Sequence, residues 1–175
     1  KAEKDFFDYN DLEHHMVRLV AGADGNRTKA AFEISDRFDE IMIDEFQDIN
    51  AVQEMIFQSI SKDESNLFMV GDVKQSIYGF RQAMPEIFIN TRGRFDRYER
   101  DRKNFPAYIV LDRNFRSRET VTQSVNFVFS QIMRRATGDI EYNREEELVY
   151  GADYPIKTGC ETELHVIARD EGQSM

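Results

Sequence analysis

The 175-residue sequence contains one cysteine, no tryptophan and only three prolines, and it lacks any long apolar run. A single cysteine, Cys160, cannot form an internal disulfide, which favours a reducing compartment over a secreted, disulfide-rich domain. No stretch reaches the about 18 apolar residues that suggest a membrane-spanning helix, and the charged first residues do not form a signal peptide. We therefore expect a cytoplasmic protein that makes no membrane contact.

Acidic residues outnumber basic ones and give a formal net charge of −10, which argues at first against a nucleic-acid partner. The charge is uneven, because residues 74–118 hold 11 Lys and Arg against 5 Asp and Glu. A basic segment of this kind can follow a phosphate backbone even on an acidic chain. Within it, residues 92–102 mix basic and acidic side chains, and a solvated amphipathic helix explains that part better than DNA binding.

Residues 41–48, with the sequence IMIDEFQD, are the stretch around which the chain is organised. A short apolar run bounded by polar residues is typical of a buried parallel strand. Asp44 and Glu45 follow at its carboxyl end, where open α/β sheets bind their ligands. A second run of this type, residues 67–70, leads into GDVKQSIYGFR at residues 71–81. A third, residues 108–111, leads into DRNFRS at residues 112–117.

The remaining periodicity predicts an α/β fold without internal repeats. Asp11 is the expected N-cap of a helix over residues 12–20, and Asn104 to Pro106 should mark the crossover into a second domain. The glycine-containing stretch 21–29 is not a phosphate-binding loop, because no GK[ST] stands between a strand and a helix. Further helices are predicted over residues 49–61, 85–102 and 117–135, and further strands over residues 66–70, 107–111 and 163–169.

The three polar segments, in this order, resemble superfamily-one DNA helicases of the UvrD type. DEFQDIN is similar to their motif II, GDVKQSIYGFR to motif III and NFRS to motif IV. The VKQ of the second segment, the sequence NFRSRETVTQSVNFVF and the later GADYP look most like the AddA group, the A subunits of bacterial helicase–nucleases. The resemblance implies partial RecA-like domains of the P-loop NTPase type, with a parallel sheet flanked by helices. Residues 1–104 would be the later part of the first domain and residues 105–175 the start of the second.

The resemblance also implies an ATP site. Asp44 would hold Mg²⁺ and Glu45 would be the general base, while Gln75 would sense the γ-phosphate. Arg116 would be an arginine finger from the second domain. Phe115 would stack on adenine, at a position where the family often has tyrosine. Gln47 and Asp48 belong to the same motif, and either loop-pinning hydrogen bonds or ligand contact would explain them.

A DNA site is implied next to the ATP site. Tyr78 and Phe80 resemble the aromatic residues on which single-stranded bases stack, and Arg81 resembles the arginine that links the DNA and nucleotide sites. Gly79 stands where the family more often has arginine, so any contact made by that arginine is missing here.

The implied full-length protein is an ATP-dependent DNA helicase that moves along single-stranded DNA in recombination and double-strand break repair. It would act at duplex ends with a second, AddB-like subunit. Because the sequence has no Walker A loop, we expect the 175 residues alone not to hydrolyse ATP. A non-catalytic interaction module is the alternative, although a scaffold has no use for Glu45, Gln75 and Arg116 together. A Mg²⁺-dependent nuclease explains less, because its acids should be spread over several elements near a lysine.

Overall fold

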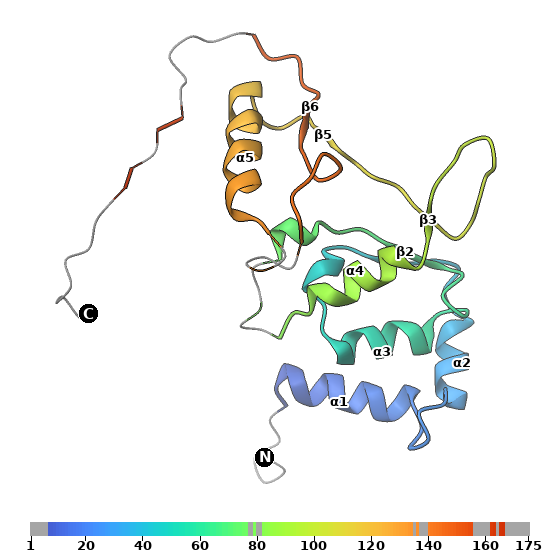
Figure 1. Cartoon of the computed structure of the whole chain (residues 1–175). Coiled ribbons are helices and arrows are strands. Elements are labelled where there is room, and N and C mark those ends of the chain that lie inside the picture. Colours follow the sequence, from blue (N-terminus) through green and yellow to red (C-terminus); the bar gives the residue numbers. More distant parts are fainter. Residues whose placement is uncertain are drawn as a thin grey trace, which may run out of the picture. The chain divides into compact units, whose positions relative to one another are not determined.

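The computed structural model describes residues 7–76, 79, 82–134, 136, 140–155, 162, 163, 165 and 166. The chain divides into two compact units, Lys1–Ile109 and Val110–Met175. The helices are α1 (Tyr9–Val20), α2 (Lys29–Ser35), α3 (Ala51–Ile60), α4 (Pro85–Gly93) and α5 (Glu119–Ile132), with short 3₁₀ helices η1 (Phe46–Asp48) and η2 (Val73–Gln75) (Figure 1). The strands are β1 (Ile41–Ile43), β2 (Leu67–Met69), β3 (Asp96–Arg97), β4 (Ala107–Tyr108), β5 (Arg113–Asn114) and β6 (Val149–Tyr150).

The strands pair in parallel as β1–β2, β3–β4 and β5–β6. The architecture is therefore mixed α/β with small parallel sheets, in agreement with the predicted class. Among the described residues, no helix combines the length and the apolar character needed to cross a membrane.

The β1–β2 pair carries the main core of the first unit. Ile41 lies opposite Leu67, and Ile43 lies opposite Met69. Side chains of η1, α3 and α4 cover one face of the pair around a buried cluster of Ile43, Phe46, Ile49 and Ile87. On the other face Met42 and Phe68 are 70% and 58% exposed, because alternate side chains of a strand point to opposite faces. The predicted parallel pairing is confirmed, but the prediction of a buried strand holds for one face only.

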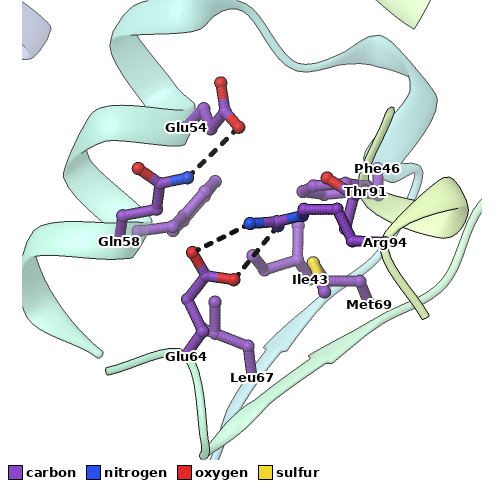
Figure 2. A pocket seen from close by; sticks show the side chains of 10 residues that line it. Ile43, Phe46, Glu54, Gln58, Glu64, Leu67, Met69, Thr91 and Arg94 are labelled. Atoms are coloured by element: carbon purple, nitrogen blue, oxygen red, sulfur yellow. Dashed lines mark hydrogen bonds and ion pairs between the residues drawn. The ribbon is translucent and has the colours of Figure 1, made fainter. Parts of the chain in front are cut away.

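An ion pair closes the outer side of this core. Arg94, just after α4, donates from its two terminal nitrogens to the carboxylate of Glu64, over distances of 3.4 and 3.1 Å (Figure 2). The pair lines a small pocket together with apolar side chains of the core, among them Ile43, Leu67 and Met69. Arg94, which belongs to the basic segment of residues 74–118, is thus paired with an acidic residue of the protein itself. Because both side chains are partly exposed, the pair contributes little to stability.

The segment after α4 differs from the prediction. The helix ends at Gly93 rather than near residue 102, and Arg94 caps it in a helical conformation. The chain then forms β3, which pairs with β4. Glycine is a poor helix former, which explains why the helix ends at Gly93 and a strand follows it. The predicted amphipathic helix over residues 92–102 is therefore wrong. The ends of β1 and β2 form the edge that carries Asp44.

The first helix starts earlier than predicted. Asp8, not Asp11, is the N-cap of α1: its side chain accepts from the Asp11 N–H at 2.9 Å, and the Asp11 side chain accepts from the Asp8 N–H at 3.2 Å. Such a reciprocal capping box places Asp11 at the third helical position. Gln53 of α3 donates to Glu13 of α1 at 2.8 Å and ties the two helices together. The predictions include no helix at α2, whose seven residues are too few to display a clear periodicity.

The second unit is built on α5, which is shorter than the predicted helix over residues 117–135. Thr122 is its most buried residue, at 2% exposure, whereas the apolar residues Val121 and Ile132 are 47% and 59% exposed. Asn126 donates to the Leu148 carbonyl at 2.9 Å and accepts from the Tyr142 hydroxyl at 2.7 Å. Polar contacts therefore help to set the inward face, and apolar spacing alone does not reveal them. The predicted strand over residues 163–169 lies largely outside the described residues.

Candidate active site

The carboxyl end of β1 positions the two predicted acids. The strand pairing extends past β1, because Val70 N–H donates to the Ile43 carbonyl and Phe46 N–H donates to the Val70 carbonyl, both at 2.9 Å. Between these two bonds the chain turns through Asp44 and Glu45, whose side chains are both exposed. Glu45 adopts the left-handed conformation, with φ 50° and ψ 43°. Such strain at a residue other than glycine often marks a functional position.

Gln47 joins the two strand ends. Its side chain is almost completely buried, at 1% exposure. Its Nε2 donates to Glu45 Oε2 at 2.8 Å, and its Oε1 accepts from the Asp72 N–H at 2.9 Å. Gly71 makes room for this amide, because a Cβ atom there would lie 2.5 Å from Gln47 Oε1. A side chain at position 71 would therefore displace the amide or the backbone around it.

The short helix η2 follows the end of β2 and presents Gln75. Asp72 is its N-cap and accepts from the Lys74 N–H at 3.1 Å. The same carboxylate pairs with Lys74 Nζ at 2.9 Å and accepts from Gln75 Nε2 at 3.0 Å. Glu45, Gln47, Asp72 and Gln75 therefore form one continuous chain of contacts across the ends of β1 and β2. Gln75 itself is exposed.

Asp48, the third acid of the motif, retains one unsatisfied oxygen. Its Oδ2 accepts a long bond from Gln47 Nε2 at 3.4 Å, and its Oδ1 is buried without a hydrogen-bond partner among the described residues. A buried carboxylate oxygen is costly unless a donor or a cation lies beside it. Both the loop-pinning role and the ligand-contact role of Asp48 therefore stay open.

The donor set at this edge suits Mg²⁺ better than a softer metal, because it consists of carboxylate oxygens. Asp44 is exposed, and its Oδ1 accepts only the neighbouring Glu45 N–H, at 3.0 Å, among the described contacts. No cluster of three His, Cys, Asp or Glu side chains that could hold a metal occurs in the described part of the chain. In nucleotide sites Mg²⁺ commonly uses one or two carboxylates together with phosphate oxygens and water. Asp44 fits that kind of coordination.

The second unit contains the NFRS segment, residues 114–117, and the residues that hold its backbone in place. Asn114 Oδ1 accepts from the backbone N–H groups of Arg116 and Ser117 at 3.0 and 2.8 Å, so the chain turns sharply after β5. Phe115 and Arg116 are exposed. The Tyr154 hydroxyl lies 3.3 and 3.2 Å from the carbonyl oxygens of Phe115 and Arg116, to which it donates. The later GADYP segment thus holds the backbone from which Arg116 projects.

Contacts of two further residues, Arg118 and Gly151, stabilise this part of the second unit. Arg118 donates to the Pro155 carbonyl at 2.7 Å, and its guanidinium lies over the Tyr154 ring. Gly151 donates to the Asn114 carbonyl at 2.9 Å, and a Cβ atom at Gly151 would lie 2.9 Å from the Phe115 ring. From the sequence, GADYP was only a feature shared with the AddA group. The bonds from Tyr154 to the Phe115 and Arg116 carbonyls were not predicted, because these residues lie nearly forty positions apart.

Three predicted DNA-binding residues, Tyr78, Phe80 and Arg81, lie outside the described residues. The pocket of Figure 2 belongs to the core and contains none of the predicted site residues. Among the described residues of the candidate site in the first unit, Asp44, Glu45 and Gln75 are exposed, whereas Gln47 beneath them is buried.

Comparison with known proteins adds the family. Residues 1–96 match the UvrD/REP helicase N-terminal domain, and this span includes Asp44, Glu45 and Gln75. The chain belongs to the UvrD/REP helicase family. The family match thus contains the whole chain of contacts from Glu45 to Gln75, whereas Phe115 and Arg116 lie beyond it.

Similar proteins extend the likeness to the second unit. The A subunit of the ATP-dependent helicase/nuclease of Bacillus pumilus is 42% identical over 182 residues, covering 99% of this chain and 14% of the relative. The protein of the same name from Pelotomaculum thermopropionicum is 45% identical over 181 residues, covering 97% and 14%. That from Clostridium kluyveri is 42% identical over 185 residues, covering 99% and 15%. The chain spans 14–15% of the length of these UvrD/REP relatives.

Proposed function

We propose that this chain is part of an ATP-dependent DNA helicase, in which Asp44, Glu45 and Gln75 serve ATP hydrolysis. The observation that carries the proposal is the continuous hydrogen-bonded path from Glu45 through Gln47 and Asp72 to Gln75. It connects two strand ends inside the span that matches the UvrD/REP family. Open α/β sheets bind ligands at such carboxyl ends.

The chemistry of phosphoryl transfer explains why these residue types are suitable. The protein has little covalent work to do, so positioning and charge stabilisation dominate. Asp44 would hold Mg²⁺, which supplies charge neutralisation on the phosphates when bound. Glu45 would accept the proton of the attacking water. The Gln75 amide can donate to a γ-phosphate oxygen and accept from the water at the same time.

Two residues of the second unit are also proposed to act on the nucleotide. Arg116 would reach the γ-phosphate as an arginine finger, and Phe115 would stack on adenine. Their exposure supports this proposal, since both side chains are accessible to a ligand. The bonds from Tyr154 to the carbonyls of Phe115 and Arg116 would keep the backbone below them in place.

We propose single-stranded DNA and duplex ends as the substrates on which hydrolysis drives movement, in recombination and double-strand break repair. Tyr78, Phe80 and Arg81 would contact the DNA. The similar proteins are named as subunits of a helicase/nuclease, which supports the proposal of a partner protein in the same complex. The alternative, a non-catalytic interaction module, gives no reason for exposed Asp44, Glu45 and Gln75 after the ends of two paired strands.

Exchange of the proposed base tests the function. In the full-length protein, Glu45→Gln should keep ATP binding and abolish DNA-stimulated ATP hydrolysis, because an amide cannot accept the proton from water. Binding can be followed with a fluorescent ATP analogue, and hydrolysis by phosphate release. Undiminished hydrolysis in this variant would rule out Glu45 as the base. Absence of ATP binding and hydrolysis in the unaltered full-length protein would favour the interaction module.

A further inference from the structure

We infer that Gln47 is a positioning residue, which orients the Glu45 carboxylate for ATP hydrolysis and fixes it relative to η2. This inference rests on the proposed function, because it requires Glu45 to act as the base. Gln47 itself is buried and is not proposed to touch the nucleotide.

The donors around Gln47 determine the orientation of its amide. The Asp72 N–H can only donate, so the atom 2.9 Å from it must be the amide oxygen. The amide nitrogen then faces the carboxylates of Glu45 and Asp48, at 2.8 and 3.4 Å. A flipped amide would place its nitrogen against the Asp72 N–H and its oxygen against two carboxylates. Only one orientation satisfies all of these groups.

Backbone hydrogen bonds already hold the turn after β1, so the side chain of Gln47 is not needed to fix the path of the chain. Phe46 N–H bonds to the Val70 carbonyl and Asp48 N–H bonds to the Glu45 carbonyl, both at 2.9 Å. These bonds fix the path of the chain but leave the exposed Glu45 side chain free to change rotamer. The bond from Gln47 Nε2 restrains the carboxylate itself. The opposite end of the same amide restrains Asp72, which in turn holds Gln75.

The test compares variants of the full-length protein. Gln47→Met keeps the approximate size of the side chain and removes its three hydrogen bonds, to Glu45, to Asp48 and from the Asp72 N–H. It should lower kcat of DNA-stimulated ATP hydrolysis about 100-fold, as expected when a catalytic group is misplaced by about 1 Å, and leave the affinity for ATP unchanged. Gln53→Met is the matched control. Gln53 also donates to a carboxylate, Glu13, at 2.8 Å and accepts from a backbone N–H, that of Asn50, at 3.3 Å. Its replacement should affect stability but leave kcat unchanged.

A second variant tests the donor and the acceptor of the Gln47 amide separately. Gln47→Glu can still accept from the Asp72 N–H. Beside the carboxylates of Glu45 and Asp48 the new carboxyl can donate to Glu45 only while it is protonated, so kcat should fall as in Gln47→Met once the pH is high enough to ionise it. If Gln47→Glu keeps the full kcat over the whole pH range in which the protein is folded, only the bond to Asp72 matters and the inference is wrong. If both variants lose kcat and ATP affinity together, or fail to fold while Gln53→Met folds, Gln47 is structural and the inference is also wrong.

Glu45→Gln, measured in the same series, separates this inference from the proposed function. If Glu45→Gln keeps its turnover, the proposed function fails and the inference fails with it. If Glu45→Gln loses turnover while Gln47→Met retains it, the proposed function stands and only the role of Gln47 is refuted.

Discussion

The left-handed backbone of Glu45 leads to a prediction that separates stability from activity. With φ 50° and ψ 43°, Glu45 occupies a region that costs a residue with a Cβ atom about 1–2 kcal/mol. Glu45→Gly and Glu45→Ala both remove the carboxylate and the bond from Gln47. The two variants therefore differ mainly in backbone strain and in the entropy of the unfolded chain.

The expected difference follows from these two contributions. Glycine relieves the steric cost of about 1–2 kcal/mol but increases the conformational freedom of the unfolded chain, which costs about 0.4–1 kcal/mol. Glu45→Gly should therefore be more stable locally than Glu45→Ala by about 1 kcal/mol, or about fivefold in the equilibrium for local opening. Neither variant should hydrolyse ATP, because both lack the proposed base.

Hydrogen exchange detected by mass spectrometry measures this difference within the full-length protein. The N–H groups of Phe46 and Asp48, which bond to the Val70 and Glu45 carbonyls, report on the turn. They should be more protected in Glu45→Gly than in Glu45→Ala. Gln58→Gly and Gln58→Ala, at an exposed position in α3, are the control pair. Here Gln58→Ala should show the greater protection, because alanine exceeds glycine in helix propensity by about 1 kcal/mol. Equal or greater protection in Glu45→Ala would refute the left-handed assignment.

The remaining predictions concern the second unit and the isolated chain. Arg116→Ala in the full-length protein should lower kcat by roughly 10³–10⁵-fold, as for arginine fingers elsewhere, and Tyr154→Phe should lower it about tenfold or less, since it removes only hydrogen bonds to the backbone. Steady-state ATP hydrolysis measures both, and a larger loss in Tyr154→Phe than in Arg116→Ala would contradict this order. Residues 1–175 alone should release no phosphate from ATP in the presence of single-stranded DNA, and robust turnover would refute the argument from the missing Walker A loop.

Local sequence patterns were sufficient to predict the strands and the helix next to the candidate site. The apolar runs identified β1 and β2, and the spacing of apolar residues identified α3, although β2 and α3 are shorter than their predicted ranges. These features depend on residues within a few positions of one another.

Contacts between distant positions were not predictable in the same way. The bond from Gln47 to Asp72 joins residues 25 positions apart, and that from Tyr154 to Arg116 joins residues 38 positions apart. The β3–β4 pair was missed for a related reason. Two-residue strands have no periodicity, and the charged run around Arg97 is equally compatible with a helix. The predicted roles of Asp44, Glu45, Gln75 and Arg116 stay predictions until nucleotide binding is measured.

A crystal structure of the full-length protein with Mg²⁺ and a non-hydrolysable ATP analogue would test the central claim most directly. The claim is that the carboxyl ends of β1 and β2 form one side of an ATP site. We expect Asp44 to hold the metal directly or through a water molecule, and the Gln75 amide to contact the γ-phosphate. A nucleotide bound elsewhere, with Asp44 and Gln75 both facing solvent, would contradict the claim.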